Sequence, residues 1–405
     1  MSVEIRTIEP AEFRDFAHAM RRVFLVAAPT DDEVEFMRQR FDLSRTWAAF
    51  DKRQIVATFH SFPTQLTVPG GTVAADAVTV VTVAPTHRRQ GVLTSLMAID
   101  HEAAAARGDA ASILISAEWP IYGRFGYGPA ADDADYTIDT RAARISGPYS
   151  GTVELCQLAD LREDAARIYE QFRPTRPGSI EREPLWWDIK LGITPRPGST
   201  DPVQSALRHR TGRTVDGVVR YHVENNWDNR VPNSTFIVDE LLAATAEVER
   251  DLWRFCCELD LVRTIRAVNR SVDEPLSWLL HDGRGVLQTR RGDFLWVRPL
   301  NVVALLGARS YASAGRLVIE VIDPAGYAAG RFAIDSDGSD ASCRRVKSRP
   351  DLTIGVSALG SICLGGVRLG TLRAAGLIDE HRPRAVDRGE AMFHSPVVPW
   401  CNTGF

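Results

Sequence analysis

The chain has 405 residues, too many for a typical single hydrophobic core, so two or three domains are expected. Its 44% hydrophobic and 25% charged residues are ordinary for a soluble globular protein, and a formal net charge of −4 gives no reason to expect nucleic-acid binding as the main role. The sequence has no run of about 18 apolar residues that would predict a membrane span, and its start alternates like a strand and lacks the apolar core of a signal peptide, which together predict a cytoplasmic protein with no membrane partner.

The first part of the chain predicts a strand, two helices and three further strands. Residues 3–8 alternate as a strand, and residues 10–23 carry apolar side chains at helical spacing. A second helix opens with three carboxylates, Asp31, Asp32 and Glu33, which suit the positive end of a helix dipole. The strands are predicted at residues 47–50, 55–66 and 73–83, with a hairpin turn at Gly70-Gly71.

The stretch Val78–Met97 reads as a strand, a basic turn and a helix. Its β-branched run favours a buried strand, Pro85 ends that strand, and apolar residues recur at helical spacing from Val92. A helix start with free N–H groups, a glycine that allows close approach and the Arg88-Arg89 pair together favour an anionic phosphate. The same pattern also arises by chance on a solvated surface, so by itself it leaves both interpretations open.

The helix after the turn is expected to end near Gly108. A strand at residues 112–116 then lies parallel to the earlier strand through a right-handed crossover. The next segment, Glu118–Gly128, places glycines among aromatic residues, which indicates a tight loop or short helix against a cavity. Within it, Tyr122 is either a proton donor or a buried core tyrosine with a satisfied hydroxyl. Tyr127 is a second candidate and is better explained as structural.

Beyond the linker-like residues 147–151, the chain repeats the same order of elements. This second unit has predicted strands and helices at residues 153–158, 161–172, 203–208, 214–222, 236–239, 245–259 and 264–268. The residues leading into its last helix include carboxylates and neither an arginine pair nor a glycine, so the unit is not expected to bind a phosphate.

A third region begins near residue 292. It predicts strands at residues 294–298, 317–322 and 330–334, and residues 356–364 fit either a helix or a strand. The six cysteines form no Cys-x-x-Cys pair and are interpreted as small buried hydrophobic residues. The nine histidines lack the spacing of metal ligands, so no metal is predicted.

Three segments together resemble the Eis (enhanced intracellular survival) family of GNAT N-acetyltransferases. They are Val81–Leu93, Ile121–Pro129 and the chain end from Pro396 to Phe405, and the resemblance covers essentially the whole chain. It implies an α/β (α+β) fold with tandem GNAT-like domains and a C-terminal sterol-carrier-like α/β domain, assembled as a homo-hexamer. The implied boundaries are a catalytic, acetyl-CoA-binding domain at 1–148, a degenerate GNAT-like domain at 149–291 and a sterol-carrier-like domain at 292–405 that delivers the C-terminal carboxylate.

The resemblance also assigns roles to residues. In GNAT folds two parallel strands splay apart and the thioester of acetyl-coenzyme A enters between them. Here this implies that Val81 and Val83 bind the pantetheine, that Tyr122 is the general acid and that the main-chain carboxylate of Phe405 is the general base. The implied diphosphate turn consists of Arg88, Arg89, Gln90, Gly91 and Val92.

The function predicted on this basis is transfer of an acetyl group from acetyl-CoA to a primary amine by direct attack in a ternary complex. The acceptor stays open between an aminoglycoside-like polyamine, a lysine and a small arylalkylamine. Trp119 and Pro120 stand where the family pattern has glycines, and Val80 where it commonly has an aromatic residue, so the amine pocket is expected to differ. The carboxylates at the start of the second helix either suit the helix dipole or attract the amine. The alternative function is a non-catalytic CoA-sensing or lipid-binding protein.

Overall fold

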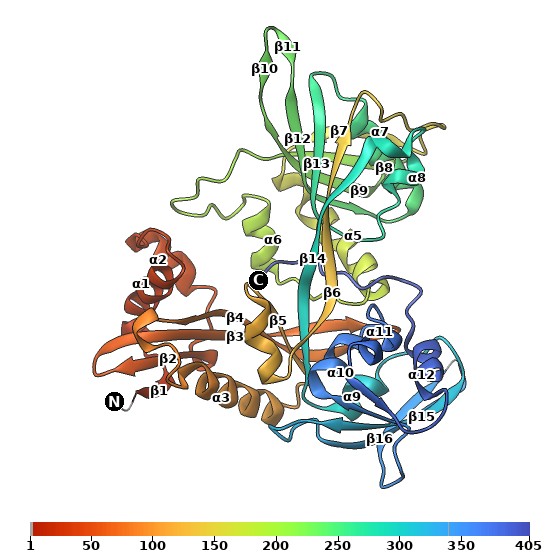
Figure 1. Cartoon of the computed structure of the whole chain (residues 1–405). Helices are drawn as coiled ribbons and strands as arrows, with labels where there is room; N and C mark the ends of the chain where they lie inside the picture. The colour runs from red at the N-terminus through yellow and green to blue at the C-terminus, as the bar shows by residue number, and fades with distance from the viewer. Residues whose placement is uncertain (1–2, 339) are drawn as a thin grey trace.

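The computed structural model describes residues 3–338 and 340–405, which form two lobes joined by long strands (Figure 1). The first unit lies in the lower lobe. Its strands are β1 (Glu4–Thr7), β2 (Thr46–Asp51), β3 (Gln54–Val68), β4 (Gly71–Val83), β5 (Ala111–Ile115) and β6 (Gly128–Asp139). Its helices are α1 (Phe13–Val23), α2 (Asp31–Arg38), α3 (Val92–Arg107) and α4 (Trp119–Tyr122).

The second unit forms the upper lobe. Its strands are β7 (Thr152–Cys156), β8 (Ser205–Thr211), β9 (Thr214–Glu224), β10 (Trp227–Asp228), β11 (Val231–Pro232), β12 (Ser234–Ala243) and β13 (Val262–Arg270). Its helices are α5 (Arg162–Phe172), α6 (Pro184–Lys190), α7 (Ala246–Cys257) and α8 (Leu276–Leu279). The predicted order of elements in this unit is confirmed.

The third region packs beside the first unit in the lower lobe (Figure 1). Its strands are β15 (Gly315–Ile322), β16 (Gly330–Ser336), β17 (Ala341–Arg345), β18 (Leu352–Gly355) and β19 (Ile378–Glu380). Its helices are α9 (Val302–Gly307), α10 (Val356–Ile362), α11 (Leu369–Ala374) and α12 (Ala385–Phe393). The segment that the sequence left ambiguous is therefore the helix α10.

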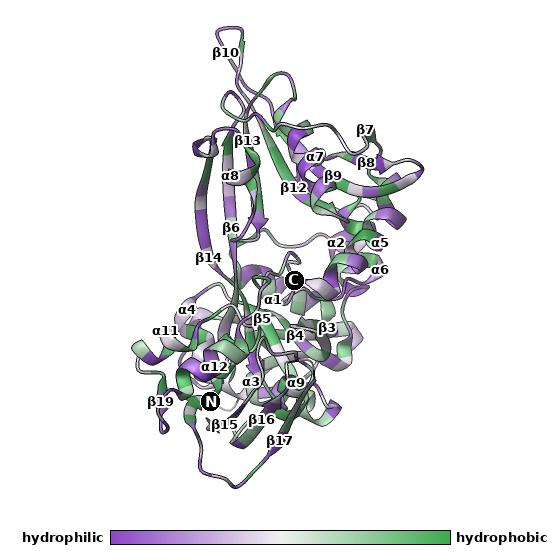
Figure 2. Ribbon diagram, turned by 90° about the vertical axis from the view of Figure 1, so that its right-hand side faces the viewer, coloured by the Kyte–Doolittle hydropathy of each residue, from purple (hydrophilic) through white to green (hydrophobic). Residues whose placement is uncertain are grey.

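A continuous sheet runs through both lobes in the order β1-β2-β3-β4-β5-β14-β6-β13-β12-β9-β8-β7. Strand β14 (Val286–Pro299) lies between β5 and β6, with Leu295 opposite Ile115 and Val297 opposite Gly128. Strands β6 and β14 together span the waist between the lobes, as both views show (Figures 1 and 2). The predicted boundary between residues 291 and 292 falls inside β14.

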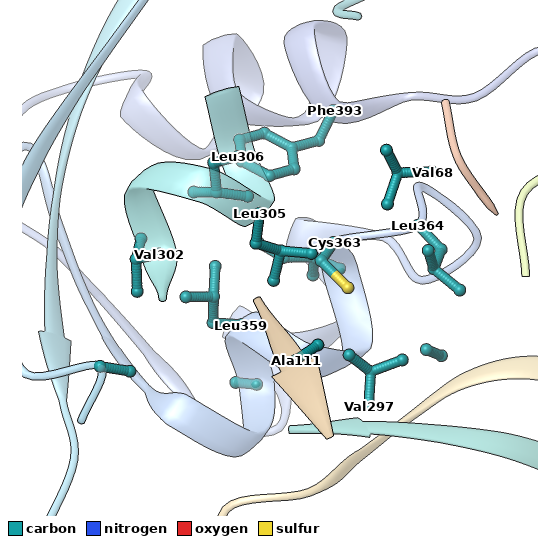
Figure 3. Packing of buried hydrophobic residues seen from close by; sticks show 14 of the residues in the cluster. Val68, Ala111, Val297, Val302, Leu305, Leu306, Leu359, Cys363, Leu364 and Phe393 are labelled. Atoms are coloured by element: carbon teal, nitrogen blue, oxygen red, sulfur yellow. The ribbon is translucent and has the colours of Figure 1, made fainter. Parts of the chain in front are cut away.

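The first unit and the third region share one hydrophobic core. Its buried side chains come from β3, β5 and β14 and from α9, α10 and α12, and they interdigitate where these elements meet (Figure 3). Leu305, Leu359 and Phe393 are almost completely inaccessible to water. Burial of such side chains contributes roughly 1.5–3 kcal/mol each, so the third region is a structural part of the lower lobe.

Two further features of the fold bear on the predictions. The cysteines are buried, as predicted, except for the half-buried Cys156. Within residues 3–338 and 340–405, none of the helices is both long enough and apolar enough to span a bilayer.

Candidate active site

Strands β4 and β5 separate part of the way along their length. They pair in parallel only from Ala75 opposite Ala111 to Val78 opposite Leu114, while β4 continues to Val83 beside β3. The separation begins at an irregularity, because Val80 has a positive φ of 47° and the register between β3 and β4 shifts there. Among the described residues, no strand pairs with β4 beyond this point on the β5 side, so a ligand can reach the backbone there.

The turn after β4 is shaped for close approach to a backbone. Arg89 and Gly91 both adopt left-handed conformations, with φ of 62° and 83°, and α3 begins at the next residue. No acidic side chain lies in the first turn of α3. Arg88 and Arg89 are exposed, and neither forms an ion pair with any residue that the structure describes. Exposed cations, free N–H groups and the positive end of a helix dipole therefore meet at one point, which suits a diphosphate.

Tyr122 lies beside the opening between the two strands. It ends α4, and it packs against the same hydrophobic cluster as Val81, Val83 and Leu93. Its hydroxyl has no hydrogen-bond partner among the described residues. Burial, helped by the nearby charge of Glu118, raises the pKa of Tyr122 to about 12, so the phenol is protonated at neutral pH.

Tyr127 has the structural role that the sequence favoured for it. Its side chain is fully buried, and its hydroxyl lies 2.7 Å from Ser112 Oγ and 2.9 Å from His101 Nε2. Its ring meets that of Tyr122 edge-on, with centroids 6.0 Å apart. The two tyrosines are therefore neighbours with opposite surroundings, one hydroxyl free of protein partners and the other doubly engaged.

The chain end returns to the waist between the lobes, where both views place the C-terminus (Figures 1 and 2). The Trp400 N–H donates to the carbonyl oxygen of Pro177 at 2.8 Å. The Phe405 ring meets Phe62 of β3 edge-on, with centroids 5.6 Å apart, and Phe62 is opposite Ala77 of β4. The last residue therefore lies against the strand next to the one that carries Val81 and Val83.

Two aromatic neighbours of this chain end were missed by the sequence reasoning. His60 lies 6.4 Å from Phe62 between ring centroids, and it stacks on Phe41 at 4.3 Å. Burial lowers the pKa of His60 to about 4, so the imidazole is neutral at physiological pH. The available signal was that residues 60 and 62 are two apart on a predicted strand and so share one face.

The α2 carboxylates that were considered as amine attractants are largely engaged in ion pairs and a cap. Asp31 pairs with Arg14, and Glu33 lies 2.7 Å from Arg21. Glu33 also forms a capping box with Thr30 at the start of α2. The capping box supports the helix-start explanation for Glu33, whereas Asp31 is held by its ion pair with Arg14.

The connection that leads into the helix is much shorter in the second unit than in the first. Residues 84–91 connect β4 to α3, whereas only Ala244 and Thr245 connect β12 to α7. The Thr245 side chain accepts a hydrogen bond from the N–H of Val248 and so caps the helix start itself. The second unit therefore has no counterpart of the loop at residues 84–91, and the expectation that it does not bind a phosphate stays a prediction.

A parallel strand pair that splays, and then leads through a basic glycine turn into a helix, is the layout of an acetyl-CoA-binding domain. Models of the acetyltransferase (GNAT) domain match residues 4–130 and 178–299, and a model of the sterol carrier protein domain matches residues 302–402. The predicted fold class is thereby confirmed. The protein is an acyltransferase of the GNAT class, a fold that uses acetyl-CoA as co-substrate.

Whole-chain relatives narrow this class to a family. An uncharacterized N-acetyltransferase of Streptomyces griseus is 37% identical over 415 residues, covering 99% of both chains. The N-acetyltransferase Eis of Mycobacterium tuberculosis is 35% identical over 343 residues, covering 82% of this chain and 81% of that one. The crystal structure of Eis1 from Mycobacterium abscessus superposes with a TM-score of 0.86 at 33% identity, covering 99% of this chain and all of the other. The chain belongs to the Eis N-acetyltransferase family, as its motifs predicted.

Proposed function

We propose that the protein transfers the acetyl group of acetyl-CoA to a primary amine by direct attack in a ternary complex. The observation that carries this proposal is the opening between β4 and β5, which leads directly into the basic turn at the start of α3. In the proposed complex the pantetheine amides bond to the backbone of Val81 and Val83. The diphosphate lies on the turn formed by Arg88, Arg89, Gln90, Gly91 and Val92.

The proposed reaction needs one base and one acid. The substrate ammonium gives a proton to the Phe405 carboxylate, directly or through water, and the freed nitrogen attacks the thioester carbon. As the tetrahedral intermediate collapses, the C–S bond breaks and the Tyr122 phenol donates its proton to the sulfur. In the same step, one of the two protons on the cationic nitrogen passes to the phenol oxygen. The products are the N-acetylated amine, free coenzyme A and one proton, and no covalent enzyme intermediate is formed.

The pKa values limit how these proton transfers are timed. A pKa of about 12 makes Tyr122 a weaker acid than an ordinary thiol, whose pKa is about 8.5. Full transfer to a free thiolate would therefore be uphill by roughly 5 kcal/mol. The transfer is feasible when the cationic nitrogen of the intermediate supplies its own proton in the same step.

The pKa of a terminal carboxyl group is low for a general base. An exposed α-carboxyl has a pKa of about 3.3–3.7, well below that of an alkyl ammonium. The ring of the half-buried Phe405 packs edge-on against that of Phe62. The proposed role of the Phe405 carboxylate is to hold the ammonium and to accept a proton only as the nitrogen begins to attack.

Among the predicted acceptors, the surroundings of Phe405 favour a small arylalkylamine. The half-buried rings of Phe62 and Phe41 lie on either side of the buried His60 and offer apolar surface near the chain end to an aromatic body. Two of the α2 carboxylates that would attract a polycation, Asp31 and Glu33, are paired with Arg14 and Arg21. Aminoglycoside-like polyamines and lysine side chains are therefore the less favoured acceptors.

Thiol release from acetyl-CoA with a panel of amines tests the proposal directly. Phenethylamine, an N-acetyl-lysine amide and an aminoglycoside represent the three acceptor classes, and phenethylamine is expected to give the highest kcat/KM. Preference for the aminoglycoside would contradict the acceptor assignment. If acetyl-CoA binds and no amine in a broad panel is acetylated, the CoA-sensing or lipid-binding alternative is favoured.

A second experiment tests the proposed base. Two glycines added after Phe405 move the carboxylate away and are expected to abolish turnover while leaving acetyl-CoA affinity unchanged. The same two glycines added before Met1 are the control for the added mass. Full activity in the C-terminally extended chain would remove Phe405 from the mechanism.

We also propose, from the family resemblance, that the chain assembles as a homo-hexamer in the cytoplasm. Light scattering coupled to gel filtration is expected to give the mass of six chains, and a monomer would contradict the proposal. Cell fractionation tests the location.

A further inference from the structure

We infer that the second GNAT unit is a receptor for the chain's own C-terminal tail, and that Arg182 is the positioning residue that fixes the end of that tail. This inference rests on the proposed role of the Phe405 carboxylate. The tail is defined here as residues 396–405.

Arg182 of the second unit binds the tail through hydrogen bonds. Its side chain is completely inaccessible to water. Its Nε donates to Thr403 Oγ1 and its Nη2 donates to the Asn402 carbonyl oxygen, both at 2.9 Å. Its third nitrogen lies 2.8 Å from Glu240 of β12. The planar guanidinium therefore forms two hydrogen bonds to the tail and one ion pair with the second unit.

Aromatic rings enclose this guanidinium. It lies 3.9 Å from the ring centroid of Tyr169 and 4.0 Å from that of Trp186. The Tyr169 hydroxyl also lies 3.2 Å from Thr403 Oγ1. A charge buried this deeply is costly unless its donors are satisfied, and the tail satisfies two of them. Arg182 and the tail thus stabilise each other.

A second arginine, Arg270, contacts the tail at Trp400, upstream of the residues that Arg182 binds. Arg270, at the end of β13, donates to the carbonyl oxygen of Leu241 on β12 at 3.0 Å. Its guanidinium lies 5.2 Å from the ring centroid of Trp400 and 5.5 Å from that of Trp253. It also pairs with Glu274 at 2.7 Å. Arg270 therefore links Trp400 of the tail to Leu241 of β12, which is next to Glu240, the ion-pair partner of Arg182.

Arg182 and Arg270 contact the sheet on β12, beyond the point where β12 and β13 separate. Strands β12 and β13 pair in parallel from Ser234 only as far as Val238, and β12 runs on to Ala243. This is the same topology as the separation of β4 and β5 in the first unit. Glu240 and Leu241 lie on the part of β12 that pairs with β9 but not with β13. The corresponding part of the first unit carries the residues proposed to bind pantetheine. In the second unit, which has no turn for a diphosphate, two arginines close this opening and bind the tail instead.

Anchoring of the tail restricts where the terminal carboxylate can lie. A free chain end samples many conformations, whereas a base must be held within hydrogen-bonding distance of its substrate. Thr403 lies two residues before Phe405, so anchoring it confines the terminal carboxylate to a short radius. Loss of this anchor is expected to lower kcat and leave acetyl-CoA binding in the first unit unchanged.

Carboxypeptidase A tests the anchor, because it removes a C-terminal phenylalanine only from an accessible tail. The full-length wild-type protein is expected to resist it, with Phe405 release followed by intact-mass spectrometry. Arg182→Lys keeps a cation for Glu240 and loses the fork that binds two tail atoms, and Thr403→Val removes the acceptor from the tail side. Each is expected to release Phe405 roughly tenfold faster or more.

Arg220→Lys is the matched control. Arg220 is also a buried arginine of the second unit and bonds Gln204 at 2.9 Å, and it has no hydrogen bond or ion pair to the tail among the described residues. It lies opposite Glu240 in the pairing of β9 with β12 and acts on that carboxylate through a charge that lysine keeps. The control variant is expected to behave as the wild type. The two tail-directed substitutions should also be non-additive when combined, because both break the same contact.

The outcomes separate this inference from the proposed function. Faster Phe405 release with a lower kcat and an unchanged KM for acetyl-CoA supports both. Faster release with an unchanged kcat supports the receptor and refutes Phe405 as the base. Unchanged release in both Arg182→Lys and Thr403→Val, or equally fast release in Arg220→Lys, overturns the inference whatever the activity.

Discussion

The two neighbouring tyrosines allow one sharp test of the proposed acid, because their hydroxyls have opposite surroundings. Tyr122→Phe removes a hydroxyl that bonds to no described residue, so the free energy of unfolding is expected to change by less than about 0.5 kcal/mol. Tyr127→Phe removes a fully buried hydroxyl that contacts both Ser112 and His101. It leaves the buried His101 Nε2 without that partner, so a loss of about 1–3 kcal/mol is expected.

Turnover is expected to respond in the reverse order. If proton donation limits the rate, Tyr122→Phe lowers kcat by roughly 10²–10⁴-fold, whereas Tyr127→Phe leaves kcat within a few-fold of wild type. Thiol release measures turnover, and denaturant unfolding with acetyl-CoA titration confirms that each variant is folded and binds the co-substrate. Unchanged turnover in Tyr122→Phe, or an equal loss in Tyr127→Phe, would refute the assignment of Tyr122 as the acid.

The remaining predictions concern the turn, the core and the sheet. Arg88→Ala is expected to raise the KM for acetyl-CoA about five- to tenfold with kcat unchanged, in steady-state kinetics, because the proposed complex places the Arg88 guanidinium against the diphosphate; a fall in kcat alone would contradict this. Gly91→Ala should lower the free energy of unfolding by roughly 1–2 kcal/mol, because alanine is strained at a φ of 83°. Backbone strain is the whole expected cost, because no atom lies within 4 Å of the added methyl group. Folding lowers the pKa of His60 from 6.5 to about 4, so between these values the unfolded chain binds a proton that the folded chain does not. The contribution of His60 to the free energy of unfolding is therefore full above pH 6.5 and falls by about 3 kcal/mol as the pH drops towards 4. The stability difference between wild type and His60→Gln should shrink over that range in denaturant titrations, and a constant difference would contradict it. Residues 1–148 alone are expected to show no cooperative unfolding, because β5 and β6 would lack β14 between them.

The sequence predicted the local elements well because their signals are local. The positive φ values at Gly91 and Gly108 appear where glycines stand at the two ends of α3. The run of β-branched residues before Pro85 became the end of β4. The turn, the helix and the position of Tyr122 after the next strand all follow from patterns shorter than about twenty residues.

The contacts that complete the site were not predictable in this way. Arg182 and Thr403 are 221 residues apart, and neither has a neighbouring motif that indicates the other. Periodicity also could not reveal that the alternating residues 294–298 pair with β5 on one side and β6 on the other. Such pairings depend on which edges the rest of the fold leaves open, and a single sequence does not contain that information.

The position of β14 makes the catalytic unit dependent on the whole chain. The sheet of the first unit is complete only when residues 286–299 occupy the gap between β5 and β6. Until then these two strands expose unpaired edges, which favour aggregation over folding. The proposed base lies still later, at the last residue, and it is held by arginines of the second unit. In this proposal the acetyl-CoA site and the base come together only in the finished chain, which gives the second GNAT domain the role of holding the base.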